Sequence, residues 1–101
     1  MDKQEQLPPS FVVAGMPMYN EEETIGTVVT TALRHVDAVI CIDDGSSDSS
    51  ARIAEACGAI VYRHRSNRGY GAALKTLFIK AREKIGRSTR LNSSHHPLSR
   101  M

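Results

Sequence analysis

The sequence has no tryptophan, few aromatic residues and no long apolar segment. Aromatic residues make up 5% of its 101 residues, too few for a stacking surface that would bind nucleic acid. No apolar run approaches the roughly 18 residues of a membrane span. The polar start MDKQEQLPPS lacks the apolar core of a signal peptide. We therefore expect no nucleic-acid partner and a cytoplasmic location, either free or at the cytoplasmic face of a membrane in a parent protein.

An excess of one charge is also missing. Of the 13 basic and 11 acidic residues, three arginines and no acid lie in the last fifteen residues, which leaves a net charge of −1 for the rest. This balance excludes a continuous basic stripe for a phosphate backbone. Cysteine is scarce, and Cys41 and Cys57 lie in apolar surroundings without a CxxC motif. This setting favours two small buried side chains over a metal or redox site, and a reducing compartment.

The sequence does contain a regular alternation of short apolar runs and amphipathic segments. The predicted strands, continuous apolar runs bounded by turn residues, are 11–16, 36–44 and 59–64. The predicted helices, where apolar residues recur at helical spacing, are 21–34, 49–57 and 70–85. Strands that are apolar on both faces are typical of a parallel sheet covered by helices. The order predicts an α/β fold, a truncated Rossmann-like parallel sheet of three βα units.

Both ends of the chain differ from this alternating region. Residues 1–10 are polar and close with two prolines, which predicts a disordered lead. Residues 87–101 have no apolar period, which predicts an unstructured tail. The segment RSTRLNSSH in this tail looks like the translation of a sequencing-library adapter, so we expect the tail to be non-native and the chain to be a fragment. The domain expected to fold is 11–86.

Three polar segments, PMYNEE, IDDGSSD and RSNRGYG, directly follow the predicted strands. Ligands of open parallel sheets bind beyond the carboxyl ends of the strands, so the three segments belong to one rim. Tyr19 can lie flat against a nucleobase, or it is only a partly buried residue where Pro17 ends the strand. Gly69 and Gly71 before a helix are a weak phosphate signal, and a solvated basic loop is the alternative.

The acids after the second predicted strand allow two interpretations. A carboxylate only accepts hydrogen bonds, so it fits the N–H edge of uracil or guanine, or a ribose hydroxyl. The alternative is a polar turn in which Asp48 caps the next helix. Because neighbouring residues of a strand point to opposite faces, only one of Asp43 and Asp44 is expected to face a ligand.

Together, PMYNEE, IDDGSSD and NRGYGAALK resemble, in order and spacing, the start of inverting nucleotide-sugar glycosyltransferases of the GT-A fold, similar to glycosyltransferase family 2. The nearest type is the polyprenyl- or dolichyl-phosphate mannose or glucose synthases, and the resemblance covers residues 11 to about 85. It implies a UDP- or GDP-sugar as donor, a lipid phosphate such as a polyprenyl phosphate as acceptor, and Mg or Mn in the full-length parent.

The resemblance also implies nucleotide-sugar-binding roles for six residues. They are Pro17, Tyr19, Glu21, Ile42, Asp44 and Lys75. The first three match the family's first nucleotide-contacting segment. The next two match residues that hold the base, with the aspartate on its N–H edge and the preceding aspartate mainly structural. The lysine matches the start of a helix near the donor.

The sequence departs from this family after its third predicted helix. Family members carry a later Asp-x-Asp motif, which binds the metal, on a fourth strand, and a catalytic base further on. Neither is present in this sequence, so we expect the fragment to bind no metal, to hold no catalytic residue and to be inactive by itself. Without a fourth strand, residues 11–16 would form a bare apolar edge, which predicts marginal stability and self-association through that edge.

Two other functions fit the sequence less well. Nucleotidyltransferases begin with a Gly-rich loop and a basic residue after the first strand, and PMYNEEE has neither. A non-catalytic doubly wound module that binds a nucleotide or Mg, similar to a receiver domain, has its acidic pair after the first strand. Here Asp43 and Asp44 follow the second predicted strand, which counts against such a module.

Overall fold

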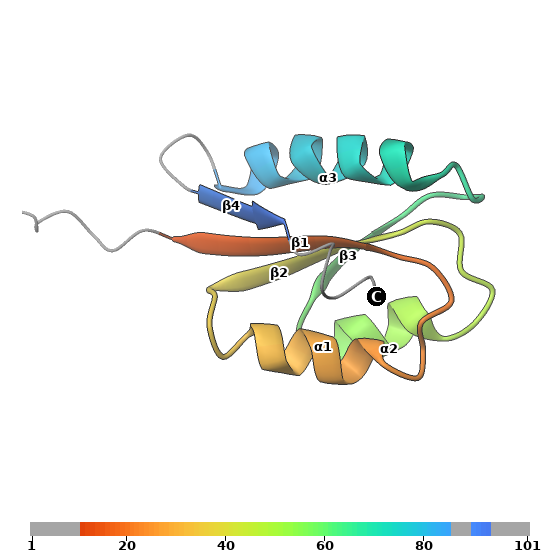
Figure 1. Ribbon diagram of the computed structural model, residues 1–101, viewed down its shortest axis with the longest axis horizontal. Helices are drawn as coiled ribbons and strands as arrows, with labels where there is room; N and C mark the ends of the chain where they lie inside the picture. The colour runs from red at the N-terminus through yellow and green to blue at the C-terminus, as the bar shows by residue number, and fades with distance from the viewer. Residues whose placement is uncertain (1–10, 86–89, 94–101) are drawn as a thin grey trace, which may run out of the picture.

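The computed structural model describes residues 11–85 and 90–93 as a parallel sheet with helices on both faces (Figure 1). The strands are β1 (Val12–Met18), β2 (Ala38–Asp43), β3 (Ile60–Arg63) and β4 (Arg90–Ser93). The helices are α1 (Ile25–Ala32), α2 (Ser50–Ala56) and α3 (Tyr70–Ile85). The strand order is β3-β2-β1-β4, and all three pairings are parallel. The predicted truncated Rossmann-like α/β fold is confirmed.

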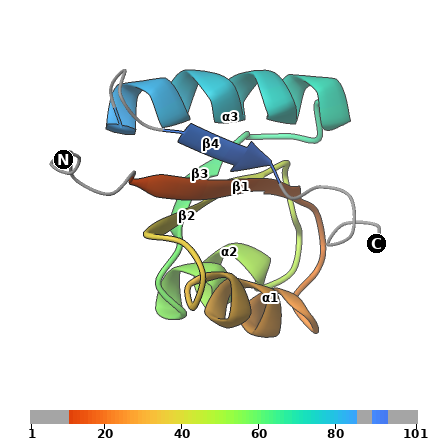
Figure 2. The same cartoon turned by 60° about the vertical axis from the view of Figure 1, so that its left-hand side comes forward.

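Each face of the sheet has its own apolar core. Helices α1 and α2 cover one face and α3 covers the other (Figures 1 and 2). Neighbouring strand residues point to opposite faces, so β1 and β2 supply both cores. The buried residues on the α1 and α2 side are Ala14, Met16, Met18, Ile25, Val29, Val39, Cys41, Ala54 and Ala59. Those on the α3 side are Val13, Ile40, Ile42, Ala73, Leu77 and Ala81.

The helices agree with the sequence prediction to different degrees. Helix α3 has the predicted bounds, whereas α1 begins four residues later than predicted. The carbonyl of Glu21 accepts from the N–H groups of both Thr24 and Ile25, which makes a turn before the helix. Asn20 has a φ of 50°, outside helical geometry. Within the described part of the chain, no helix has both the length and the apolar character needed to cross a membrane.

Strand β1 continues through Pro17, where the sequence predicts its end. The strand runs to Met18, and Pro17 lies opposite Ile42 of β2. Proline removes a ladder donor and is therefore found at strand edges. Pairing of β1 with β4 stops at Gly15, so Pro17 has a strand neighbour on one side only in the described sheet.

Strand β4 lies along the edge of β1 that the sequence predicts to be bare. Residues 90–93 lie in the segment predicted to be unstructured, yet they pair with Val12–Gly15 of β1. The segment RLNS has no apolar period that would predict a strand. It can pair nevertheless, because an unpaired strand edge is a template for any extended segment. Within the described sheet, β4 covers the edge of β1 over Val12–Gly15, and self-association stays a prediction. The predicted lead, 1–10, and the rest of the tail lie outside the described residues.

Candidate nucleotide-binding site

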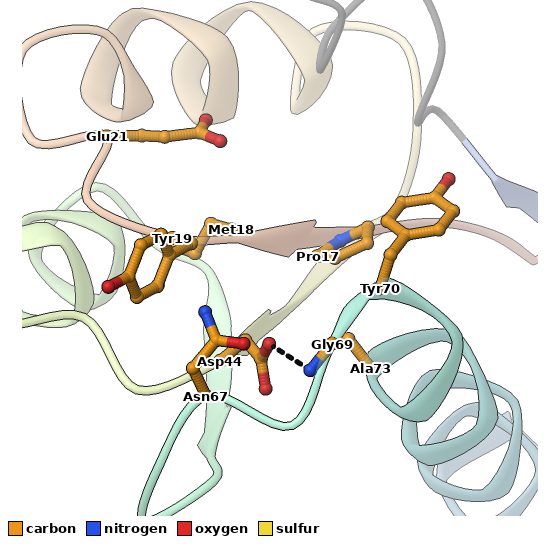
Figure 3. A pocket seen from close by; sticks show the side chains of 9 residues that line it. All are labelled: Pro17, Met18, Tyr19, Glu21, Asp44, Asn67, Gly69, Tyr70 and Ala73. Atoms are coloured by element: carbon orange, nitrogen blue, oxygen red, sulfur yellow. Dashed lines mark hydrogen bonds between the residues drawn. The ribbon is translucent and has the colours of Figure 1, made fainter.

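A pocket lies at the carboxyl ends of β1 and β2, beside the first turn of α3 (Figure 3). Its volume is about 270 Å³, close to the lower end of small-molecule pockets at roughly 300 Å³. This is the rim where open parallel sheets bind their ligands. The lining residues, which define what we call the rim pocket, are Pro17, Met18, Tyr19, Glu21, Asp44, Asn67, Gly69, Tyr70 and Ala73.

Two tyrosines give the rim pocket aromatic surface. Tyr19 is 46% exposed and Tyr70 is 49% exposed. Figure 3 shows them on different sides of the site, with Pro17 and Met18 between them. Because every base has an apolar π-face, exposed aromatic rings at a pocket rim can stack on one. The rim pocket therefore offers a flat ligand an apolar contact on tyrosine.

Asp44 supplies the buried carboxylate of the rim pocket. It follows β2 directly, and its N–H donates to the carbonyl of Met18, which extends the pairing with β1 by one residue. The side chain is nearly buried and accepts three hydrogen bonds. The N–H of Arg68 donates to Oδ1 at 2.9 Å, and the N–H of Gly69 donates to Oδ2 at 2.9 Å (Figure 3). The third partner is His64, whose Nδ1 lies 2.7 Å from Oδ1.

These contacts keep the Asp44 carboxylate charged. Burial raises the pKa of Asp44, but the Arg68 N–H, the His64 side chain and the Gly69 N–H act in the opposite direction and outweigh it. The net pKa lies below the ordinary value of 3.8. A carboxylate that is ionised at neutral pH has no proton to donate, so it selects a ligand group that carries N–H or O–H.

His64 connects Asp44 to α3. Its ring is buried, and Nε2 lies 2.8 Å from the hydroxyl oxygen of Thr76. Because the Asp44 carboxylate only accepts, His64 Nδ1 must carry the hydrogen. The sequence by itself predicts no site role for His64. Its partners are 20 and 12 residues away in the chain, so no local motif announces the contact.

Asp43 points away from the rim pocket, as strand alternation predicts. Its Oδ1 accepts from the N–H and the hydroxyl of Ser46. Arg63 Nε lies 2.9 Å from Oδ2, in ion-pair contact without the alignment of a hydrogen bond. Asp43 thus supports the turn through Ser46, and Asp44 is the acid of the pair that lines the rim pocket. That Asp44 faces a ligand stays a prediction.

A second polar cluster joins the loop after β1 to the loop after β2. We call residues 20–24 and 46–50 the interlocked loops. The N–H of Glu21 donates to Ser50 Oγ at 2.7 Å, and the N–H of Ser49 donates to Glu22 Oε1 at 2.9 Å. In the same way, Asn20 N–H donates to Ser46 Oγ. The loops are thus held to each other by bonds that run in both directions.

Asp48 belongs to these interlocked loops and also caps α2, as predicted. Ser49 makes no side-chain cap bond, whereas Asp48 Oδ1 accepts from the N–H and hydroxyl of Ser50, the first residue of the helix. Asp48 Oδ2 accepts from the N–H of Glu22. Among residues 11–85 and 90–93, no three His, Cys, Asp or Glu side chains gather as a metal site would require.

Glu21 lies between the interlocked loops and the rim pocket, and its side chain lines the latter. Burial raises the pKa of Glu21, the Tyr19 backbone lowers it, and the charge of Asp48 raises it again. The net direction is upward from 4.5. The Glu21 carboxyl therefore holds its proton more readily than an exposed glutamate does.

The structure brings together four of the six predicted site residues: Pro17, Tyr19, Glu21 and Asp44 line the rim pocket. Ile42 does not, because strand alternation places its fully buried side chain in the core beneath α3. Its side chain has a packing role, and its predicted contact with the base stays a prediction. Lys75 is exposed on α3 and does not line this pocket either.

Several lining residues were missed by sequence reasoning. Asn67 and Tyr70 belong to the RSNRGYG segment, whose polar and aromatic residues were available as a signal. Met18 and Ala73 could not be predicted to line a site, because an apolar residue at a strand end or on a helix face is typical of core packing.

Comparison with known proteins places this geometry among sugar transferases. Residues 14–86 match the glycosyl transferase family 2 domain. An uncharacterized protein of Methanocaldococcus jannaschii is 36% identical over 91 residues, which cover 86% of this chain and 37% of that protein. The chain therefore spans little more than a third of the length of this relative.

Two solved structures extend the comparison. Glucosyl-3-phosphoglycerate synthase from Mycobacterium tuberculosis, in complex with Mn²⁺, uridine diphosphate and glucosyl-3-phosphoglycerate, is similar at 32% identity and a TM-score of 0.55, over 64% of this chain and 27% of that one. Mannosyl-3-phosphoglycerate synthase from Rubrobacter xylanophilus is similar at 26% identity and a TM-score of 0.55, over 69% of this chain and 30% of that one. With residues 14–86 matched and both sequence and fold in agreement, the chain belongs to glycosyl transferase family 2.

Proposed function

We propose that the rim pocket binds the nucleoside part of a UDP- or GDP-sugar, and that the parent protein transfers the sugar to an acceptor. The observation that carries this proposal is the charged Asp44 carboxylate, fixed by three donors in a pocket that also exposes tyrosine rings. This combination suits a flat ring with an N–H on its edge. Uracil and guanine both have such an edge.

Each lining group has a task in this proposal. Tyr19 stacks on the base, and Asp44 accepts from its N–H edge. The Asn67 side chain lines the same pocket and can donate to a base carbonyl. Glu21, at the border with the interlocked loops, accepts from a ribose hydroxyl. Pro17 and Met18 close the apolar floor between the tyrosines.

The transfer step itself is assigned to parts of the parent beyond the rim pocket. An acceptor oxygen attacks the anomeric carbon with inversion, and the bond to the diphosphate breaks. A relative is named in complex with Mn²⁺, and we propose Mg or Mn in the parent, where it neutralises the diphosphate. The described residues of this chain do not fit a metal cluster, so no step is derived through one.

We propose an acceptor that carries a phosphate. The sequence resemblance implies a polyprenyl phosphate, whereas the two structural relatives are named for 3-phosphoglycerate products. Both acceptors share a phosphate group, and the rim pocket holds no feature that separates them. We therefore propose a phosphate-bearing acceptor, either a lipid phosphate or a small phosphorylated acid, for a parent protein that lies in the cytoplasm or at the cytoplasmic face of a membrane.

Isothermal titration of the chain with UDP and with GDP tests the donor proposal. We expect binding of at least one nucleotide and a loss of about tenfold or more in Asp44→Asn, because hydrogen bonds to charged groups contribute about 1.5–3 kcal/mol. Tyr19→Ala should weaken binding by about 1–3 kcal/mol, and Tyr19→Phe should not.

Asp48→Asn is the matched control, since it removes a carboxylate from the interlocked loops and should leave nucleotide affinity unchanged. Absence of any nucleotide binding would contradict the proposal. Binding of Mg²⁺ without a nucleotide would instead favour the non-catalytic module.

A further inference from the structure

The Asp44 carboxylate has nearly used up its capacity to accept hydrogen bonds. A carboxylate offers about four acceptor positions, two on each oxygen. Oδ1 accepts from His64 Nδ1 and from the N–H of Arg68, so both of its positions are taken. Oδ2 accepts from the N–H of Gly69. One position therefore remains, on Oδ2.

The three donors that occupy Asp44 are held in place. Arg68 and Gly69 donate from the backbone immediately before α3, and the Gly69 carbonyl accepts from the N–H of Ala73 in the first turn of that helix. The His64 side chain is 7% exposed, and its second nitrogen contacts Thr76 of α3. The carboxylate cannot turn to present a second oxygen without breaking the bond to His64.

The number of free acceptor positions distinguishes the two candidate bases. The edge of uracil carries one N–H between two carbonyls. The edge of guanine carries an N–H beside an amino group, and an aspartate satisfies this pair by accepting one hydrogen on each oxygen. A single remaining acceptor leaves one guanine donor without a partner, and an unpaired donor in a buried site lowers affinity.

We propose that His64 is a positioning residue that limits Asp44 to a single acceptor and thereby makes the rim pocket selective for uracil over guanine. This inference rests on the proposed function, since it assigns the base within that nucleotide site. It makes UDP-sugars the donor class of the parent. His64 acts through Asp44 and touches no part of the nucleotide.

Inosine diphosphate isolates the acceptor count from the size of the base. Hypoxanthine is a purine like guanine, but it lacks the amino group and offers one N–H. We expect the wild-type chain to bind UDP at least tenfold more tightly than GDP in calorimetric titrations, with inosine diphosphate severalfold tighter than GDP. GDP binding that equals or exceeds binding of inosine diphosphate would overturn the inference.

His64 variants test the role of this residue. His64→Phe keeps a ring but removes the donor, which frees one acceptor position on Oδ1, so the preference for inosine diphosphate over GDP should fall to less than twofold. His64→Asn is the conservative control, because its amide can replace Nδ1 as donor to Asp44 and should restore the wild-type ratio. An unchanged ratio in His64→Phe, with both variants folded by circular dichroism, contradicts the inference.

Two further measurements distinguish failure of the His64 variant to fold from failure of the proposal. If His64→Phe does not fold, the wild-type ratios still decide, together with a long-range ¹H–¹⁵N spectrum in which Nδ1 must carry the hydrogen. A spectrum that places the hydrogen on Nε2 alone would overturn the proposal. If no diphosphate binds at all, the proposed nucleotide site fails. Binding without the predicted ratios contradicts only the role of His64.

Discussion

The interlocked loops and the rim pocket lie side by side on the same rim, and they differ in what surrounds their carboxylates. In the interlocked loops, Glu22 and Asp48 both accept from backbone N–H groups of the facing loop. In the rim pocket, Asp44 keeps one acceptor position beside two exposed tyrosines. Both regions are acidic, and Asp48 and Asp44 each accept three hydrogen bonds, so neither acid content nor acceptor count identifies the site. The exposed tyrosine rings beside Asp44 distinguish the rim pocket.

The largest effect is expected at Gly45, which joins the two regions. Its φ is +84°, and a β-carbon there would lie 2.7 Å from the backbone nitrogen of Asn67. Strained backbone of this kind costs about 1–3 kcal/mol, and the clash with a backbone atom cannot relax by rotating a side chain. We expect Gly45→Ala to lower the free energy of unfolding by about 3 kcal/mol, measured by urea denaturation.

Gly71→Ala is the control for this substitution. A β-carbon at Gly71 meets no heavy atom within 4 Å, and the residue lies in α3. Replacing a helical glycine by alanine stabilises by up to about 1 kcal/mol. A Gly45→Ala variant as stable as Gly71→Ala would show that Gly45 does not lie against the backbone of Ser66 and Asn67.

The second effect separates Asp43 from Asp44. Asp43 is fully buried, accepts from Ser46 and pairs with Arg63, so Asp43→Ala removes the acceptor of these groups. We expect a loss of about 2 kcal/mol in unfolding free energy, while the folded variant keeps its affinity for UDP within about twofold. Paired denaturation and titration of Asp43→Ala and Asp44→Asn measure both quantities. Equal losses of UDP affinity in the two variants would contradict the separate roles of Asp43 and Asp44.

A third effect is the dependence of stability on pH. The folded-state pKa of Asp44 lies below its ordinary 3.8, so the unfolded chain takes up this proton first. The stability that Asp44 contributes is therefore present above about pH 4 and is lost as the pH falls through the lowered pKa. Denaturation at several acidic pH values should show a shallower loss in Asp44→Asn than in the wild type. A steeper loss would contradict the direction.

Glu21 gives the opposite sign. Its folded-state pKa is raised above 4.5, so the folded chain holds this proton more tightly than the unfolded chain. Its contribution to stability is greatest at low pH and falls as the pH rises through the raised pKa. Glu21→Gln should remove this decline in the range just above about pH 4.5. A decline that persists in Glu21→Gln would assign it to another group.

The smallest effect concerns the core beneath both regions. Cys41 is fully buried, and burial, followed by the charges of Glu21 and Asp43, raises the pKa of its thiol to about 12. Cys57 is only partly buried. A thiol reagent applied to the folded chain should label Cys57 and leave Cys41 unmodified, as read by mass spectrometry of peptides. Equal labelling rates would indicate that β2 opens readily.

The sequence predicts the fold well, because each element has its own local pattern. The apolar period of α3 is uninterrupted, so both of its ends agree with the structure. Tyr19 and Asp44 were predicted because they directly follow strands, and all strand ends share one rim. Ile42 was assigned to the site by motif position, whereas strand alternation places it in the core.

Other features could not be predicted, because they depend on contacts between distant segments. The bond between His64 and Asp44 joins residues 20 apart, and Asn20 accepts from the N–H of Ser47, 27 residues away in the facing loop. Strand β4 is set by the free edge of β1 and has no pattern of its own. Local propensity does not predict such pairings, because they depend on the backbone groups that remain unpaired once the rest of the sheet has formed.

A ¹H–¹⁵N correlation spectrum recorded during titration with UDP tests the central claim most directly, because it reports on both regions at once. The account predicts shifts of the amide signals of Tyr19, Arg68 and Gly69 around the rim pocket. The amides of Glu22 and Ser49, which are committed to the interlocked loops, should stay in place. Shifts confined to Glu22 and Ser49, or a spectrum that UDP does not change, would contradict the assignment of the rim pocket as the nucleotide site.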